Sequence, residues 1–168
     1  IARFRSRDLS PVELMQATIE RAMAVEPAIG AFADQYFDEA LASAREAEAK
    51  YAGGGDPRPL EGLPVAIKDE EAQTGRRNTN ASLIYQDHIA DHNSPIVERV
   101  LEAGGIVHAR TRTPEFSCMP FTHSRLWGVT HNPWNTAYDV GGSSGGAAAS
   151  LASGTSTLAS GSDIGGSI

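Results

Sequence analysis

The sequence predicts one α/β domain. Segments with helical periodicity alternate along the chain with short apolar runs that are typical of buried strands. The chain has 168 residues, of which 40% are hydrophobic and 21% charged, as in an ordinary folded domain with a sizeable core. Together these observations predict helices layered on a sheet and exclude a disordered chain.

The first helix is predicted to begin at Ser10. Pro11 suits a first helical turn, and Glu13 stands three residues after Ser10, which makes a capping box. Apolar residues then recur at steps of three and four, so the helix has one apolar face. We expect it to end near Glu26, before Pro27, because a proline disfavours helical conformation in the residue before it.

Two more helices precede the C-terminal third. One is predicted from about 37 to 52, where Ala and Glu are frequent, and the glycines at 53–55 end it. The other opens at residues 94–95, a Ser-Pro pair, and closes at the glycine pair 104–105.

Strands are predicted at 63–67 and 106–109, which are short apolar runs. Residues 141–168 consist mainly of Gly, Ser and Ala, a composition that is typical of flexible linkers. Leucine and isoleucine recur within this tract, however, so we expect a small-residue helix at 147–152, a short strand at 155–160 and a tight turn at 163–167.

Composition excludes several classes of function. The chain has 14 Lys+Arg against 21 Asp+Glu and a net charge of −7, which argues against a broad nucleic-acid surface. No apolar run is long enough for a membrane helix, and the Arg-rich residues 1–9 do not resemble a secretory signal. The single cysteine, Cys118, excludes an internal disulfide and is compatible with a reducing compartment, so we expect a cytoplasmic location.

Lys68 is unusual because it follows an apolar strand, where lysine is rarely buried. One interpretation is a side chain that reaches solvent and pairs with Asp69 or another carboxylate. The other is a buried lysine whose pKa has fallen, so that its amine acts as a general base near neutral pH.

Two glycine-serine segments are candidates for chemistry. Residues 141–146 place Ser143 and Ser144 between glycines, but all five histidines precede them, which argues against a nucleophile elbow with a later histidine. Residues 161–167 could form a nest of backbone N–H groups for an oxyanion, or a purely structural turn.

Other candidates are weaker. His88 and His92 are four residues apart, yet no third metal ligand is evident, so we expect a polar loop and no metal site. Cys118 is predicted to be a small buried hydrophobic residue. Trp127 and Trp134 could wall an acyl pocket or, as aromatic residues more often do, pack loops.

Four motifs, taken in order, resemble the amidase signature family. They are 62–69 (Gly-Leu-Pro-Val-Ala-Ile-Lys-Asp), 132–135 (Asn-Pro-Trp-Asn), 141–147 (Gly-Gly-Ser-Ser-Gly-Gly-Ala) and 163–168 (Asp-Ile-Gly-Gly-Ser-Ile). The resemblance implies an α/β fold in which helices cover both faces of a mixed central sheet. It also implies a Ser–Ser–Lys triad that needs no metal or cofactor.

The resemblance assigns a role to each site residue. Ser167 would be the nucleophile, Ser143 with its cis peptide bond the proton relay, and neutral Lys68 the base. The oxyanion hole would be formed by the backbone N–H groups of Ile164, Gly165, Gly166 and Ser167. Ser144 and Asp163 would support the site.

The sequence departs from the family in two respects. Glu70 and Glu71 replace the small or amide residue and the apolar stretch that usually follow the Lys-Asp pair, and they favour a charged Lys68 unless they point to solvent. Family members are also longer. We therefore expect the N-terminal part of one amidase domain, with a helical region at about 1–60 and an incomplete catalytic α/β core at about 61–168. This piece alone should be inactive and should expose apolar surface.

The expected function is hydrolysis of a carboxylic amide C–N bond through an acyl-enzyme on Ser167. One alternative is an A-type subunit of a glutamine-dependent tRNA amidotransferase, which would need a second kind of subunit as its partner; another is an inactive fragment. The substrate would be a small-molecule amide, with no direct nucleic-acid contact and no membrane segment, and a homodimer is left open.

Overall fold

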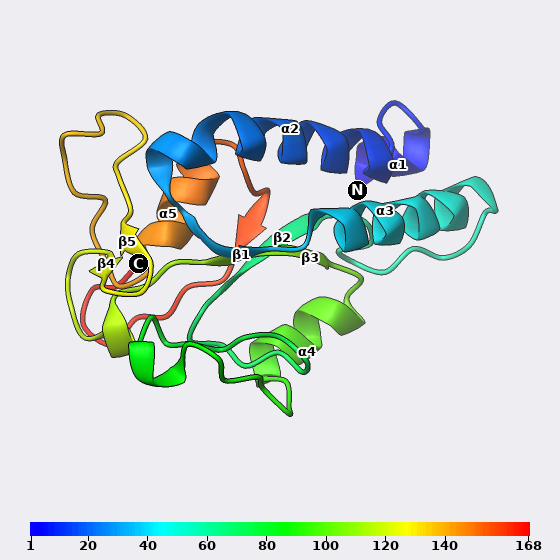
Figure 1. Cartoon of the computed structure of the whole chain (residues 1–168). Helices are drawn as coiled ribbons and strands as arrows, with labels where there is room; N and C mark the ends of the chain where they lie inside the picture. The colour runs from blue at the N-terminus through cyan, green and yellow to red at the C-terminus, as the bar shows by residue number, and fades with distance from the viewer.

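A four-stranded mixed sheet lies at the centre of the structure, a computed structural model that describes residues 1–168 (Figure 1). Its strand order is β1 (Phe32–Gln35), β3 (Ile106–Thr111), β2 (Pro64–Lys68) and β6 (Leu158–Ala159). Strand β2 is parallel to both β3 and β6, whereas β1 is antiparallel to β3. The prediction of an α/β fold with a mixed central sheet is therefore confirmed.

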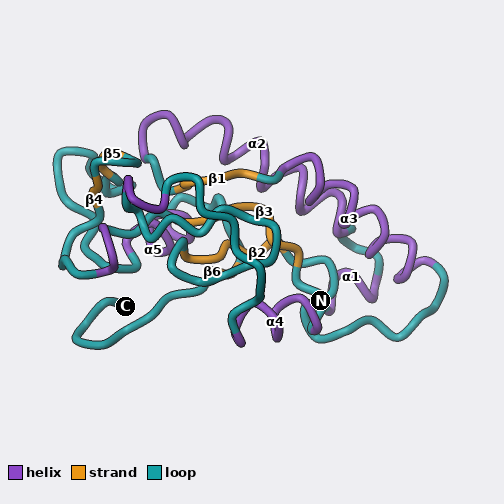
Figure 2. Tube along the Cα trace, turned by 60° about the horizontal axis from the view of Figure 1, so that its bottom comes forward, coloured by secondary structure: helices purple, strands orange, loops and turns teal.

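Helices cover both faces of this sheet, as expected. Figure 1 shows α2 (Pro11–Ile29) and α3 (Phe37–Ala52) on one side and α4 (Pro95–Glu102) on the other. Helix α5 (Gly145–Ala152) lies on the α2 side, and the short α1 (Ala2–Ser6) contacts α3. A second view shows the same layers from below (Figure 2).

Small side chains form the core between the sheet and helices α2 and α5. Ala22 of α2 and Ala149 of α5 share one buried cluster with Ala66 and Ala109 of the central strands. Alanine lets the helix axes approach the sheet closely. On the opposite face, Val97 of α4 meets the β-branched residues of β2 and β3, which are Val65, Ile67 and Val107. Both faces of the central strands are therefore buried, as their continuous apolar runs predict.

Helix α2 ends later than predicted. Its capping box is present, but it runs through Pro27 to Ile29, so the expected end near Glu26 is wrong. The proline stands in the last turn, where it interrupts only the end of the hydrogen-bond ladder. Gly30 is left-handed and donates its N–H to the carbonyl of Glu26, at 2.8 Å. The Glu26 carboxylate also accepts the N–H groups of the two following residues, Ala31 and Phe32.

Helices α3, α4 and α5 agree with the prediction, the short α1 was not predicted, and the strands agree in part. Helix α3 covers 37–52 as expected, and α4 begins at Pro95. Strand β6 is shorter than the expected 155–160, and β1 was not predicted at all. Because β1 has four residues and pairs with a strand far along the sequence, its local pattern carries little signal.

Irregular segments connect these elements. They contain two 3-10 turns, η1 (Leu83–Tyr85) and η2 (Glu115–Ser117), and a small hairpin of β4 (His123–Ser124) and β5 (Gly128–Val129). Cys118 directly follows η2 and is exposed, so the prediction that it is buried is wrong. The turn directs this side chain outward, and its thiol donates only to the neighbouring carbonyl of Phe116.

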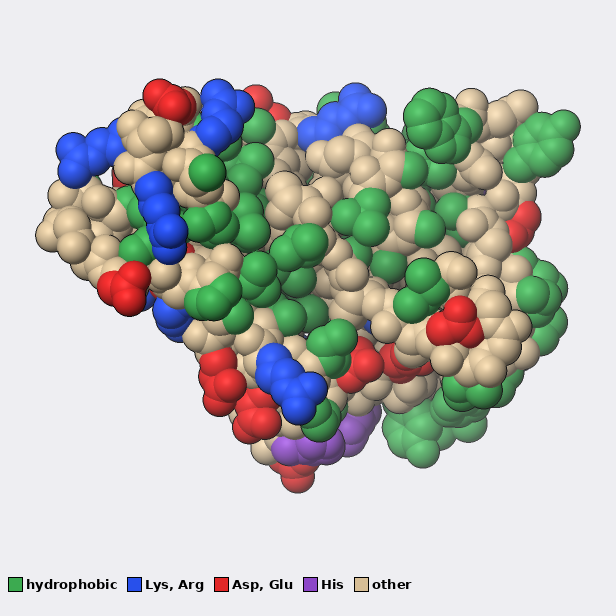
Figure 3. All heavy atoms as spheres, turned by 180° about the vertical axis from the view of Figure 1, so that it is seen from behind, with side chains coloured by type: hydrophobic (Ala, Val, Ile, Leu, Met, Phe, Trp, Pro, Cys, Tyr) green, Lys and Arg blue, Asp and Glu red, His purple; other side chains and the backbone are tan.

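Several large apolar side chains are exposed, as the sequence analysis expects. They include Ile84, Trp134, Ile164 and Ile168. On the face opposite to that of Figure 1, apolar side chains lie in several groups between polar atoms (Figure 3). No helix in the structure combines the length and hydropathy that a bilayer-spanning segment requires.

Candidate active site

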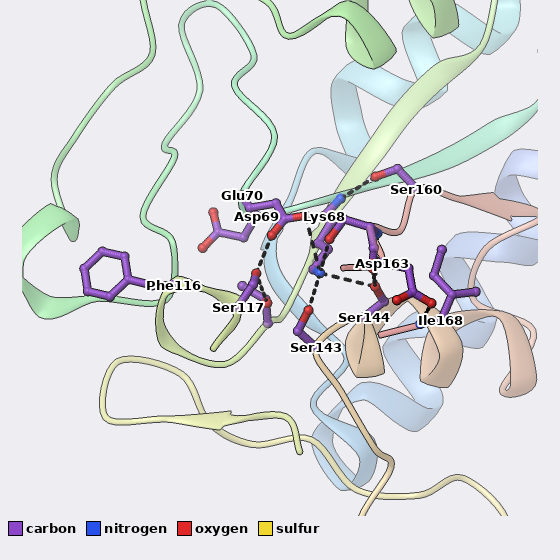
Figure 4. Close-up of polar contacts among 12 residues, drawn as sticks. Lys68, Asp69, Glu70, Phe116, Ser117, Ser143, Ser144, Ser160, Asp163 and Ile168 are labelled. Carbon is purple, nitrogen blue, oxygen red and sulfur yellow. Dashed lines mark hydrogen bonds and ion pairs between the residues drawn. The ribbon is translucent and has the colours of Figure 1, made fainter. Parts of the chain in front are cut away.

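The amine of Lys68 lies among three serine hydroxyls at the carboxyl end of β2. Its side chain is fully buried, and Nζ is 2.7 Å from Ser143 Oγ, 2.8 Å from Ser162 Oγ and 3.2 Å from Ser144 Oγ. Figure 4 shows the lysine pointing towards Ser143 and Ser144. The interpretation in which Lys68 reaches solvent is therefore wrong.

Asp69, the other residue of the Lys-Asp pair, points away from the amine. Its carboxylate is buried and accepts the backbone N–H groups of Thr79 and Ala81, at 3.2 and 3.1 Å, and the hydroxyl of Thr79. Burial raises the pKa of Asp69 above its ordinary value, although these hydrogen bonds act in the opposite direction. Asp69 thus holds the following loop in place and does not pair with Lys68.

The charge on Lys68 is controlled by two opposing effects. Burial lowers the pKa of Lys68, because an ammonium loses its hydration in the interior. The carboxylate of Glu70 raises the same pKa, and its Oε1 lies 3.4 Å from Nζ; Glu71 and Asp163 also raise it from further away. Glu70 therefore does not point to solvent but faces the lysine.

Ser143 and Ser144 stand at the start of α5, where glycines allow close packing. The Gly142–Ser143 peptide bond is cis, as the resemblance implies. A side chain at Gly146 would place its Cβ 2.4 Å from the backbone oxygen of Arg112, and one at Gly145 would lie 2.2 Å from Thr122 Oγ1. The helix start can approach the residue after β3 only because Gly146 lacks a side chain, and it can pack against Thr122 only because Gly145 lacks one.

The segment after β6 runs beside this helix start. Ser160 Oγ accepts the backbone N–H of Lys68 at 2.8 Å (Figure 4). Ser144 Oγ donates to the carbonyl of Ser162 at 3.1 Å and accepts its N–H at 3.2 Å. The N–H of Ser144 donates to the carbonyl of Ser167 at 3.1 Å. Sequence analysis did not single out Ser162, because nothing in a Gly/Ser-rich tract distinguishes one serine as a partner of a distant lysine.

Ser167 lies near the serine-lysine cluster without being hydrogen-bonded to it. Its side chain is half-buried and makes no hydrogen bond, so no chain of hydroxyls joins Ser167 to Ser143 in this structure. Ser167 and Ser144 both line a cavity of about 460 Å³, with Gly142, Leu151 and Ile168 among the other lining residues. The cavity gives a small molecule access to the Ser167 side of the cluster.

The loop 163–168 is organised around the carboxylate of Asp163. This carboxylate accepts the N–H groups of Gly166 and Ile168, and the hydrogen bond from Gly166 is the main reason that the pKa of Asp163 lies below its ordinary value. Ile164 and Gly165 are exposed. In this structure Asp163 itself binds the N–H groups of Gly166 and Ile168, so the oxyanion nest stays a prediction.

The remaining candidates lie elsewhere. No cluster of three or more His, Cys, Asp or Glu side chains is placed to hold a metal, and His92 contacts only its neighbour Asp91. Trp134 is exposed. Trp127 donates its indole N–H to Thr79, at 3.2 Å. Neither tryptophan lines the cavity, and only Trp127 contributes to loop packing.

Comparison with known proteins shows which family this chain resembles. A family model described as Amidase matches residues 13–168. The chain is 41% identical over 166 residues to the A-type subunit of a glutamyl-tRNA(Gln) amidotransferase from Carboxydothermus hydrogenoformans, covering 99% of this chain and 34% of that protein. It is also 41% identical over 167 residues to an indoleacetamide hydrolase of Bradyrhizobium diazoefficiens, covering 99% of this chain and 32% of that protein.

A solved structure agrees with these sequence matches. A bacterial aryl acylamidase of the amidase signature enzymes superposes with a TM-score of 0.89 at 29% identity, covering 98% of this chain and 34% of that one. The chain thus spans about a third of the length of the proteins it matches. On its sequence, its motifs and its fold, this chain belongs to the amidase signature family.

Proposed function

We propose that this chain carries the catalytic residues of a serine amidohydrolase that cleaves a carboxylic amide C–N bond. One observation carries the proposal, the fully buried amine of Lys68 at 2.7 Å from Ser143 Oγ. A buried amine beside a hydroxyl is suited to remove its proton, because burial favours the neutral form of lysine. The homologous hydrolases support an amidase-type reaction in general.

The proposed reaction begins when Ser167 Oγ attacks the amide carbonyl carbon. Its proton passes to Ser143, while the proton of Ser143 passes to Lys68. When the C–N bond of the tetrahedral intermediate breaks, the same route returns a proton to the departing amine. Ser167 is left as an ester of the substrate's acyl group. Water then attacks this acyl-enzyme, the acid is released, and the Ser167 hydroxyl forms again.

In this proposal, backbone N–H groups of the loop stabilise the negative charge on the substrate oxygen. The donors would be those of Ile164, Gly165, Gly166 and Ser167, and the Gly166 N–H would have to exchange Asp163 for substrate. Loss of one such donor typically costs about 3 kcal/mol in the reaction barrier. The hydrogen bonds from Ser144 to Ser162 and Ser167 support a role in holding this loop.

The reaction uses only protein groups, so we propose that it needs no metal or cofactor. The proposed substrate is a small-molecule amide, and we retain a cytoplasmic location as a prediction. Because the chain spans about a third of its relatives, we assign the activity to the full-length protein and expect this piece alone to be inactive. A homodimer also remains a prediction.

A second candidate function is that of an A-type subunit of a glutamine-dependent tRNA amidotransferase. The 41% identity to such a polypeptide from a glutamyl-tRNA(Gln) amidotransferase supports it as strongly as the equal identity to the indoleacetamide hydrolase supports the first. The same residues would release ammonia from glutamine. Glutaminase activity that depends on a co-purifying partner protein would favour this candidate.

Covalent labelling tests the proposed nucleophile. The full-length protein is treated with a serine-directed fluorophosphonate, and the labelled peptide is mapped. The label is expected on Ser167 and should be absent from Ser167→Ala. A label on Ser143 or Ser144 would reverse the assignment. Unchanged turnover by Ser167→Ala would favour the third alternative, in which this segment is not catalytic.

A further inference from the structure

Glu70 is the one carboxylate in contact with the buried amine, and the proposed triad does not use it. Its Oε1 lies 3.4 Å from Lys68 Nζ. The Glu70 side chain is 19% exposed, so water screens this pair less than it would a surface pair. The two residues are separated only by Asp69, which points the other way and holds the loop 79–81.

A second segment holds Glu70 in this position. Ser117 donates its hydroxyl to Glu70 Oε2 (Figure 4). Oγ1 of the buried Thr113 lies 2.9 Å from Ser117 Oγ. Ser117 and the preceding Phe116 both have a left-handed backbone, with φ of 55° and 53°. The N–H of Phe116 is bound to the carbonyl of Asn80 at 2.9 Å.

The position of the Glu70 side chain is fixed by contacts between two loops. The loop that Asp69 organises positions η2, and η2 directs the Ser117 hydroxyl at Glu70. Although burial acts to raise the pKa of Glu70, the hydrogen bond from Ser117 and the charge of Lys68 leave it below its ordinary value. Glu70 therefore faces the amine as a carboxylate, with one oxygen held by Ser117 and the other towards Nζ.

We infer that Glu70 is a positioning residue that stabilises the ammonium formed when Lys68 accepts the proton from Ser143. The inference rests on the proposed function, because it assigns Glu70 a role through the lysine base. A carboxylate beside a base makes that base stronger. It also delays the loss of the lysine's own proton as the pH rises, so the free amine appears only at a higher pH.

Other charged groups around Lys68 do not share this geometry. Glu71, on the same segment, and Asp163, on the loop after β6, act on the amine without an ion-pair contact. The start of α5 places the positive end of a helix dipole near the amine, and this dipole disfavours the ammonium form of Lys68. Glu71 therefore offers a matched control, since Glu71→Gln removes an equal charge from the same segment.

The test is the pH dependence of amide hydrolysis by the full-length protein carrying Glu70→Gln. Without the carboxylate, the acid limb of kcat/KM should move to lower pH by about one unit. The plateau at alkaline pH should fall about threefold, because a weaker base transfers the proton less readily. At pH values below the parent's limb the variant should thus be faster than the parent protein, and on the alkaline plateau it should be slower. Glu71→Gln should shift the limb by less than half as much.

A purely structural defect would lower the rate at every pH and leave the limb in place, so it would not reproduce this crossing. Should Glu70→Gln fail to fold, Ser117→Ala provides a second route. It removes the hydrogen bond to Glu70 Oε2 and should also move the acid limb of kcat/KM to lower pH. An unmoved limb in a folded Glu70→Gln overturns the inference, and so does an equal shift in Glu71→Gln. If Lys68→Met also leaves turnover unchanged, the proposed function itself has failed.

Discussion

Lys68 Nζ and Ser143 Oγ lie 2.7 Å apart, although 75 residues separate them in the sequence. The contact forms where the carboxyl end of a parallel strand, β2, meets the start of helix α5. In open α/β sheets this edge is where binding and catalytic groups commonly gather. Gly146, after the two serines, lets the helix start come this close to Ala31 and Arg112, which flank strands β1 and β3.

In the proposed mechanism, removal of the Ser143 hydroxyl should interrupt proton transfer from Ser167 to Lys68. We expect Ser143→Ala to lower kcat of the full-length protein by about 10²–10⁴-fold, the range in which a general acid-base step contributes. Steady-state kinetics measure this directly. Ser6→Ala, an exposed serine on α1, is the matched control and should leave kcat unchanged. A Ser143→Ala variant as active as this control would contradict the relay.

A side chain at Gly146 should destabilise the fold. Its Cβ would lie 2.4 and 2.5 Å from backbone atoms of Arg112 and 2.8 Å from the backbone oxygen of Ala31, none of which can rotate away. We expect Gly146→Ala to lower the free energy of unfolding by about 3 kcal/mol, at the upper end for overpacked sites. Urea unfolding measures it. Gly53→Ala, at the end of α3 with an ordinary φ of −77°, should change it little, and equal losses would contradict the close approach.

Glu61 should make stability depend on pH in the acid range. It is buried and accepts hydrogen bonds from Arg58 and Lys50. The Arg58 guanidinium is the main cause that lowers the pKa of Glu61 from 4.5 to about 2. Because the folded value is the lower one, the stabilisation is complete above pH 4.5 and is lost as the pH falls towards 2. Its size is about 1–2 kcal/mol, since both cations are nearly half exposed.

Glu61→Gln should therefore lower the free energy of unfolding at neutral pH and change it little near pH 2. Urea unfolding at both pH values measures the difference. Glu46→Gln, on the exposed side of α3, should have no effect at either pH. A loss that is the same at both pH values would show that the effect is not linked to the titration of Glu61.

The sequence predicts elements with strong local signals better than contacts made across the fold. The capping box of Ser10 and Glu13 and the glycines at 53–55 placed helix ends correctly. The helix end predicted from Pro27 was wrong, because the carboxylate of Glu26 and the left-handed Gly30 stabilise a later end than the effect of proline on the preceding residue predicts. Strand β1 is fixed by pairing with β3, which a local pattern of four residues does not reveal.

The same distinction holds for the site. The resemblance of the motifs to the amidase signature family indicated Lys68, Ser143 and Ser144, and the fold brings these three together. Ser162 was missed because its contact with the lysine depends on how the loop after β6 is folded. The direction of Glu70 also could not be predicted, since it is fixed by Ser117, 47 residues further along the chain.

The central claim is that the buried Lys68 amine acts as the base. Lys68→Met in the full-length protein removes the amine and keeps most of the side-chain volume. We expect amide turnover at neutral pH to fall by on the order of 10³-fold or more, with the thermal unfolding transition retained. Turnover equal to that of the parent protein, in a folded Lys68→Met variant, would contradict the account.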